Sequence, residues 1–270
     1  MKHKFPSNDR VSLTMDGDGI AQVRLTRPDK LNALDEAMFG ALIDAGSALF
    51  DMRGLRCVVL AGEGKGFCAG LDLTMFEIIA RGEGPPFAER THGNANRVQQ
   101  AAMQWRKLPV PVIAAVHGVC FGGGLQVASG ADIRVVAPDA RLAVMEMKWG
   151  LVPDMGGFAL WRNAVRDDQL RELTYTNREF SGEEALALGF ATIADADPLA
   201  RATAIAREIA GRSPTAIQAA KRLFNRYQDL TVDEILLEES LSQQRLFGTK
   251  NQLEAMHSQI EGRKPNFVDP

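Results

Sequence analysis

The sequence predicts an α/β fold followed by a helical C-terminal region. Up to residue 197, segments of strand character alternate with segments of helical periodicity, the pattern of sheets covered by helices. Two strand segments, 57–64 and 111–116, are continuous apolar runs, as expected for strands buried on both faces. After residue 197 only helical periodicity remains. We therefore predict a core domain over 1–197 and a helical domain over 198–270.

Each element follows from its local pattern. The turn sequence DGDG at 16–19 separates two short strands, 11–15 and 20–25, and predicts a hairpin. Ser181 and Glu184 form a capping box at the start of a helix over 181–190. Glycines and prolines predict a loop over 81–92. The other expected elements are helices over 35–51, 93–107, 123–130, 157–166 and 168–175, a short helix ending the segment 65–76, and strands over 131–138 and 141–146.

The helical region cannot bury its own apolar side chains. Apolar residues recur at helical spacing, for example Ile205 with Ile209 and the series from Ile235 to Leu246. The region is too thin to cover these stripes by itself. We therefore expect it to pack on the core or on another subunit.

Composition excludes several classes of protein. The chain has 270 residues, of which 46% are hydrophobic and 24% charged, and its net charge is −3. This balance is typical of a globular protein without general affinity for nucleic acid or anionic membranes. Residues 1–10 have no apolar core, so no signal peptide is expected. The three cysteines and four histidines show no metal-ligand spacing, which predicts a cytoplasmic protein without a metal site.

Two glycine turns are the strongest candidates for chemistry. AGLD at 69–72 and FGGGLQ at 121–126 can each present a backbone N–H group, the second one at a helix N-terminus. Such groups bind phosphate or stabilise an oxyanion, although a tight turn without a ligand is the alternative. Since no GxSxG nucleophile motif is present, an enolate is favoured over a tetrahedral intermediate. An enolate needs only a carboxylate to transfer protons.

Six motifs together resemble the crotonase superfamily, the enoyl-CoA hydratase/isomerase family. They are RPDKLNAL (27–34), GFCAGLDL (66–73), FGGGLQVASGADIRVV (121–136), ARLAVMEMKWGLVPDMGG (140–157), SGEEALALGF (181–190) and SPTAIQAAKRLF (213–224). The resemblance covers nearly the whole chain and implies a ClpP-like ββα superhelix with a C-terminal helical trimerisation domain. It also implies an acyl-CoA thioester substrate, a homotrimer or hexamer, and no cofactor beyond the coenzyme A of the substrate.

The resemblance also assigns candidate catalytic residues. The N–H groups of Leu71 and Gly123 fall on the oxyanion hole, and Glu146 falls on an acid/base glutamate. The second glutamate of the hydratases is Gln126 here, which cannot exchange a proton at neutral pH. Asp154, eight residues after Glu146, is similar to an aspartate of dienoyl-CoA isomerases. The alternatives are a solvated strand end for Glu146 and an N-cap of helix 155–166 for Asp154.

The same resemblance implies the residues that contact substrate. They are Arg27, Ala33, Ala69, Asp72, Gly122, Gln126 and Trp149. Arg27 is equally well explained as an exposed salt-bridge partner, and Trp149 as a residue of the core.

Isomerisation of a double bond in an unsaturated acyl-CoA is the function that these residues favour. Hydration of a 2-enoyl-CoA is the first alternative, with Asp154 in place of the absent glutamate. Other crotonase chemistry comes next. An RNA-binding homologue is disfavoured by the acidic charge balance. A dinucleotide-binding protein is disfavoured because the glycine run lacks G-x-G-x-x-G spacing.

Overall fold

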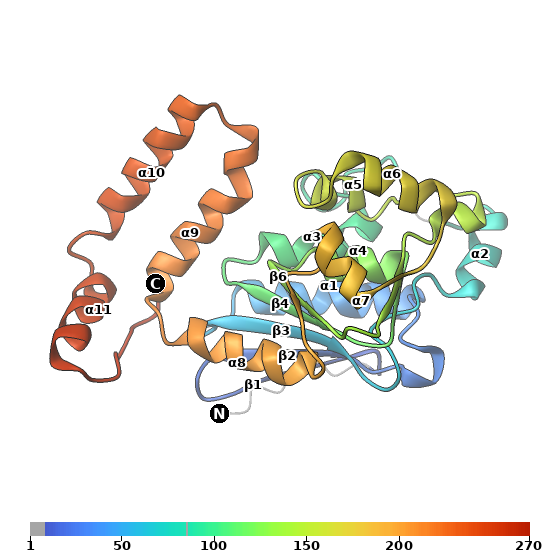
Figure 1. The fold of residues 1–270 in the computed structure, drawn as a ribbon. Helices are drawn as coiled ribbons and strands as arrows, with labels where there is room; N and C mark the ends of the chain where they lie inside the picture. The colour runs from blue at the N-terminus through green and yellow to red at the C-terminus, as the bar shows by residue number, and fades with distance from the viewer. Residues whose placement is uncertain (1–8, 85) are drawn as a thin grey trace.

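The computed structural model describes residues 9–84 and 86–270. Residues 1–8, which make up most of the segment expected to lack a signal peptide, lie outside the described residues, as does Pro85 of the predicted loop 81–92. Figure 1 shows a sheet layered with helices and a C-terminal arm of helices that extends away from it. Within the described part of the chain, no helix combines the length and apolar character needed to cross a membrane.

The larger sheet has six strands in the order β1-β2-β3-β4-β6-β9. The predicted hairpin pairs β1 with β2 in antiparallel register, and every later neighbour is parallel. The strands are β1 (Val11–Met15), β2 (Ile20–Leu25), β3 (Cys57–Gly62), β4 (Val112–Val116), β6 (Ile133–Val136) and β9 (Ile193–Ala194).

A second, three-stranded sheet was not expected from the sequence. It consists of β5 (Val119–Phe121), β7 (Arg141–Ala143) and β8 (Phe180–Ser181), in that order. β5 lies between Gly118 and Gly122, both at positive φ, and pairs only with residues more than twenty positions away. Such short strands form because of distant partners, so local sequence does not reveal them. The same holds for β9, which has two residues.

Both faces of the larger sheet are buried, as its continuous apolar strands predict. On β3, Val58 and Leu60 belong to one core cluster, whereas Val59 and Ala61 belong to the other. The first cluster is covered by helices α1 (Glu36–Phe50), α3 (Arg97–Lys107) and α4 (Gly123–Ser129). The second is covered by α8 (Pro198–Ala210), which inserts Ala202, Ile205 and Ala206. Helix α8 follows residue 197 in the chain but packs on the sheet of the core domain. The predicted domain boundary at residue 197 therefore stays a prediction.

The remaining helices begin close to the predicted residues. Ser181 and Glu184 form the predicted capping box at α7 (Gly182–Leu188). Asn96 and Gln99 form a further one at α3, which therefore begins four residues later than expected. The helix predicted over 157–166 ends early. The other bounds are α2 (Leu73–Ala80), α5 (Gly157–Trp161), α6 (Asp167–Thr176), α9 (Pro214–Arg226), α10 (Val232–Leu246) and α11 (Lys250–Glu261), with short 3-10 helices at Pro28–Lys30, Glu146–Trp149 and Tyr227–Asp229.

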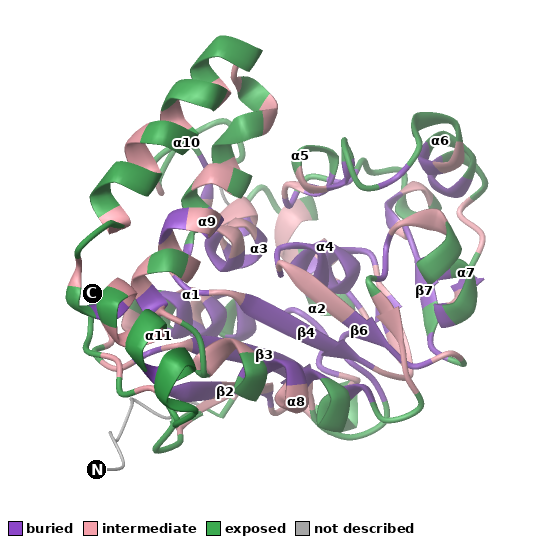
Figure 2. Ribbon diagram, turned by 60° about the vertical axis from the view of Figure 1, so that its left-hand side comes forward, coloured by how far each residue is buried: buried purple, intermediate pink, exposed green. Residues whose placement is uncertain are grey.

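The C-terminal arm presents apolar side chains to solvent. Helices α10 and α11 are largely exposed in Figure 2, whereas most residues of α9 are half-buried or buried. Phe224, Leu236, Phe247 and Ile260 are 64%, 57%, 66% and 77% exposed. At the base of the arm, Lys221 of α9 is buried and bonds to the core. Ion pairs also tie the arm to the core at Asp229, which pairs with Arg162, and at Asp269, which pairs with Arg56. The exposed apolar side chains of the arm have no covering surface within the described chain.

Candidate active site

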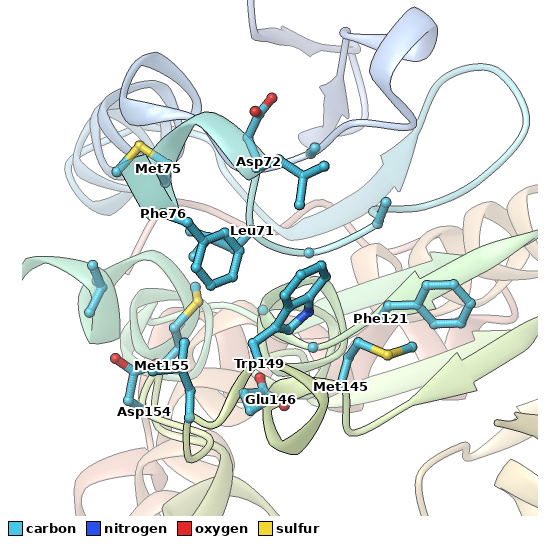
Figure 3. A pocket seen from close by; sticks show the side chains of 18 of the residues that line it. Leu71, Asp72, Met75, Phe76, Phe121, Met145, Glu146, Trp149, Asp154 and Met155 are labelled. Atoms are coloured by element: carbon cyan, nitrogen blue, oxygen red, sulfur yellow. The ribbon is translucent and has the colours of Figure 1, made fainter. Parts of the chain in front are cut away.

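A cavity of about 1020 Å³ lies between helix α2, the start of α3 and the two glycine turns. Figure 3 shows Leu71 and Phe76 on one wall, facing a wall that carries Glu146, Trp149 and Asp154. Apolar side chains form most of the lining. The cavity is large enough for an extended ligand with an apolar part.

The two predicted glycine turns meet at this cavity. Gly70 and Gly122 both have positive φ, 89° and 48°, which favours glycine. Phe121 N donates to Cys68 O across 3.0 Å, and a Cβ on Gly70 would lie 2.8 Å from Phe121 O. The N–H groups of Leu71 and Gly123 therefore lie on adjacent turns.

Neither of these N–H groups is committed to a loop or turn hydrogen bond of the described residues. Gly123 is the first residue of α4, where N–H groups have no acceptor within the helix. Both residues line the cavity. The arrangement matches the pair of donors predicted for an oxyanion.

Glu146 is buried at the cavity wall, only 9% exposed, so the solvated strand end considered from the sequence is wrong. It begins a 3-10 helix after β7. Its Oε1 accepts a hydrogen bond from Gln126, whereas its Oε2 is buried and has no partner among the described residues. Burial raises the pKa of this carboxyl, and the nearby Asp154 adds to the rise. A carboxyl of this kind is suited to proton transfer near neutral pH.

Asp154 lines the same cavity, and the walls around it raise its pKa through desolvation. The residue as a whole is exposed. The predicted N-cap role is wrong, because Gly156 occupies the N-cap of α5 and no side chain caps that helix. Asp154 therefore does not have the capping role that was the alternative explanation for this residue.

Gln126 lies behind Glu146 rather than on the cavity wall, so the expectation that it contacts substrate needs correction. It is fully buried. Its Nε2 donates to Glu146 Oε1 across 2.7 Å, and its Oε1 accepts from the N–H groups of Met155 and Gly157. The side chain touches the candidate acid/base residue instead of a ligand.

Comparison with known proteins agrees with this geometry. The family model described as enoyl-CoA hydratase/isomerase matches residues 16–270. The chain belongs to the enoyl-CoA hydratase/isomerase family. This confirms the predicted crotonase superfamily and its α/β fold with a C-terminal helical region. Members of the enoyl-CoA hydratase/isomerase family act on acyl-CoA thioesters.

Three relatives illustrate the likeness within the enoyl-CoA hydratase/isomerase family. Mitochondrial enoyl-CoA hydratase domain-containing protein 2 of Bos taurus is 31% identical over 257 residues, covering 93% of this chain and 84% of the relative. Mitochondrial Delta(3,5)-Delta(2,4)-dienoyl-CoA isomerase of Rattus norvegicus is 33% identical over 242 residues, covering 87% and 73%. The crystal structure of an enoyl-CoA hydratase from Bacillus anthracis has a TM-score of 0.86 at 25% identity, covering 96% and 99%.

The other predicted substrate residues of this family member lie around the cavity. Ala33, Ala69, Gly122 and Trp149 line it. Trp149 is 45% exposed, so the alternative that it is a residue of the core is wrong. Its ring lies 4.9 Å from that of Phe76, centre to centre.

Arg27 and Asp72, both on the cavity wall, form an ion pair with each other. Arg27 Nη1 lies 2.5 Å from Asp72 Oδ2 and also donates to Ala33 O. Asp72 caps helix α2 by accepting from Thr74 N. Arg27 is a salt-bridge partner, as the alternative had it, but the pair is largely buried and not exposed. The two residues fix the turn that carries Leu71.

A second ion pair lies at the cavity, and no sequence motif indicates it. Arg141 forms two hydrogen bonds with Glu179, of 2.6 and 2.8 Å, and both residues line the cavity. They are 38 positions apart, and β7 and β8 bring them together. No local signal connects residues at that separation. Among the described residues, no cluster of possible metal ligands is present.

Proposed function

We propose that this protein isomerises a double bond in an unsaturated fatty-acyl-CoA through an enolate. One observation carries the proposal. Four carboxyl groups line the cavity; Asp72 and Glu179 are held in ion pairs with arginines, whereas Glu146 and Asp154 form no ion pair within the described chain. Both have raised pKa values, and the charge of Asp154 contributes to the rise at Glu146. They are the groups equipped to exchange protons.

The proposed reaction moves one proton and conserves mass. With a 3,5-dienoyl-CoA, one carboxylate removes a proton from C2, and the electron pair spreads over the thioester oxygen and the conjugated carbons. The N–H groups of Leu71 and Gly123 stabilise the negative oxygen. The other carboxyl group returns a proton to C6, which gives the 2,4-dienoyl-CoA. The scheme needs no cofactor other than the coenzyme A that is part of the substrate.

Two features support isomerisation over hydration. The amide of Gln126 stands where the hydratases resembled by the sequence have a second glutamate, and it cannot give up a proton. Asp154, the other carboxyl group of the cavity, belongs to a motif that resembles the dienoyl-CoA isomerases. The rat isomerase named above is among the relatives at about 30% identity.

A panel of thioesters tests the proposal. The protein is incubated with 3,5-dienoyl-, 3-enoyl- and 2-enoyl-CoA, and the products are followed by ultraviolet absorbance and mass. We expect a change in absorbance at constant mass with the dienoyl substrate, and loss of that change in Glu146→Gln. A product heavier by one water from 2-enoyl-CoA, at a higher rate than isomerisation, would instead identify a hydratase.

We further propose a homotrimer or a hexamer, built through the exposed apolar stripes of α9, α10 and α11. Phe224 and Leu236 are typical of these stripes, at 64% and 57% exposed. Light scattering should give three or six times 29.4 kDa. A monomer would contradict this proposal. The cytoplasmic location also stays a proposal.

A further inference from the structure

The carboxamide of Gln126 is fully engaged by its surroundings. Its Oε1 accepts hydrogen bonds from the N–H groups of Met155 and Gly157, both of 2.9 Å. Its Nε2 donates to Glu146 Oε1 across 2.7 Å. The side chain is buried with 0% exposure, so water does not compete for these bonds.

These partners leave the amide only one orientation. Two backbone N–H groups can only donate, so the oxygen of Gln126 must face them and its NH2 group must face Glu146. Glu146 Oε1 is consequently an acceptor whether the carboxyl is charged or neutral. A proton on Glu146 therefore belongs on Oε2, the atom that is buried without a partner among the described residues.

The same amide connects three parts of the site. Gln126 lies one helical turn after Gly123, the first residue of α4. Through Oε1 it holds Met155, which directly follows Asp154 in the chain, and Gly157, which follows three positions after Asp154. Through Nε2 it holds Glu146. A shift of this one side chain would move the oxyanion donor and the two carboxyl groups relative to each other.

We propose that Gln126 is a positioning residue that keeps Oε1 of Glu146 an acceptor and holds the carboxyl of Glu146 in register with Gly123 N–H and Asp154. The inference rests on the proposed function, because it assumes that Glu146 transfers the proton. It adds that the glutamine orients the carboxyl of Glu146 and is more than a missing second glutamate.

The bond from Gln126 has a consequence that can be measured. Hydrogen bonding to a carboxylate favours its charged form, so this bond lowers the pKa of Glu146 against the effect of burial. Among the described residues, Asp154 is the charged side chain that acts on Glu146, and it raises the pKa. Loss of the Gln126 bond should raise the pKa of Glu146 further.

The first test is Gln126→Met, which keeps the length of the side chain and removes both polar groups. We expect kcat for C2–H exchange in deuterium oxide to fall roughly 10- to 100-fold, as misplacement of a catalytic group does. KM should change little, and the acid limb of the kcat profile should move to higher pH. The carboxyl 13C signal of Glu146 should titrate at higher pH in the free protein.

Gln104→Met is the matched control. Gln104 is a second buried glutamine, 3% exposed, whose Nε2 donates to Leu42 O and which does not line the cavity. Its replacement should lower the melting temperature and leave both the pH profile and the Glu146 signal in place. An equal activity loss in the two variants without a change of pH profile would overturn the inference.

Gln126→Glu covers the case in which Gln126→Met does not fold. The new carboxyl keeps an acceptor for Met155 and Gly157 and can donate to Glu146 only while it is protonated. We expect a bell-shaped profile in which exchange falls at high pH, since two charged carboxylates then face each other. A profile of unchanged shape would count against a donor role for Gln126.

Failure of the proposed function looks different. If Glu146→Gln still exchanges C2–H at the wild-type rate, Glu146 is not the base, and the proposed function fails in its assignment. If Glu146→Gln abolishes exchange while Gln126→Met leaves rate and pH profile unchanged, the proposed function stands and only the inference about Gln126 fails.

Discussion

Lys221 and Asp132 form a buried ion pair that fastens helix α9 to the core. Lys221 Nζ lies 2.7 Å from Asp132 Oδ2, and the lysine side chain is 5% exposed. The same ammonium donates to Trp105 O and Val110 O, at and just beyond the end of α3. A cation at a helix C-terminus also interacts favourably with the helix dipole. The exposed arm therefore starts from a fixed point.

Replacement of this lysine should weaken the whole fold. Lys221→Met removes the donor of the Trp105 and Val110 carbonyl oxygens and the cation beside Asp132, which keeps only its bond from Val112 N–H. Breaking a buried pair costs about 3–5 kcal/mol, and we expect the lower end, about 3 kcal/mol, because Asp132 is 24% exposed. Denaturant unfolding of both proteins measures the difference.

Arg226→Met is the control for this experiment. Arg226 lies on the same helix as Lys221, and the change removes its ion pair with Glu238 of α10. Arg226 is, however, 59% exposed. Such surface pairs contribute about 0–1 kcal/mol. Equal losses in the two variants would mean that Lys221 acts as an ordinary surface charge.

Glu146→Gln should stabilise the protein as pH rises. The folded-state pKa of Glu146 is raised, so its contribution to stability is full below the unfolded pKa and is lost as pH rises through the folded pKa. The glutamine does not ionise and avoids that loss. Each tenfold change in proton affinity corresponds to about 1.4 kcal/mol.

Thermal unfolding between pH 4 and pH 8 checks this sign. The two proteins should melt at similar temperatures at pH 4, and the variant should melt higher at pH 8. Glu183→Gln, an exposed position on α7, should show no such trend. A variant less stable than wild type at pH 8 would indicate that the charged form of Glu146 is favoured in the fold.

Asp154→Asn should separate chemistry from helix stability. We expect isomerisation of 3,5-dienoyl-CoA to fall about 100-fold or more, the usual contribution of a general acid or base. The melting temperature should hardly change, because Gly156 and not Asp154 is at the N-cap of α5. Full activity on every substrate of the panel would remove Asp154 from the reaction and with it the case for a dienoyl-CoA isomerase.

Gly123→Ala should abolish turnover by displacing the oxyanion donor. A Cβ at this position would lie 2.8 Å from Leu34 Cδ1 and 2.8 Å from Met155 Sδ. The new methyl group thus pushes against the cavity lining, and α4 must shift. Loss of one oxyanion donor costs about 3 kcal/mol in a well-studied case, roughly 100-fold in rate.

Gly211→Ala is the matched control for this change. Its Cβ would meet nothing closer than 3.5 Å, and its φ is −78°. It should keep wild-type turnover. If Gly123→Ala also did so, the oxyanion would have to be stabilised elsewhere.

The sequence was sufficient for the features with local or spaced signals. The hairpin at DGDG and the capping box at Ser181 depend on neighbouring residues, and both are found as predicted. The two glycine turns were identifiable because positive φ favours glycine, and Gly70 and Gly122 both have positive φ. Strands of two or three residues, such as β5 and β8, are stabilised by distant partners and lack a local signature.

Individual side-chain roles at the site needed the structure. Pattern alone left Asp154 as a possible cap, and only the register of α5 excludes this. Gln126 was expected to face the ligand because it stands where the hydratases that the sequence resembles have their second catalytic glutamate. Its actual direction is decided by Met155 and Gly157, 29 and 31 residues later, whose N–H groups capture its oxygen. Contacts over such separations follow from tertiary packing.

The position of α8 has a practical consequence for shortening the chain. Ala202, Ile205 and Ala206 cover Ile20, Val59 and Ile113 on the second face of the six-stranded sheet. A truncation at residue 197 would bare this apolar surface and invite aggregation. A cut after α9, beyond Lys221, would remove α10 and α11, leave both faces of the sheet covered and keep the Lys221–Asp132 ion pair. Single-subunit versions of this protein should therefore be designed to end beyond that helix.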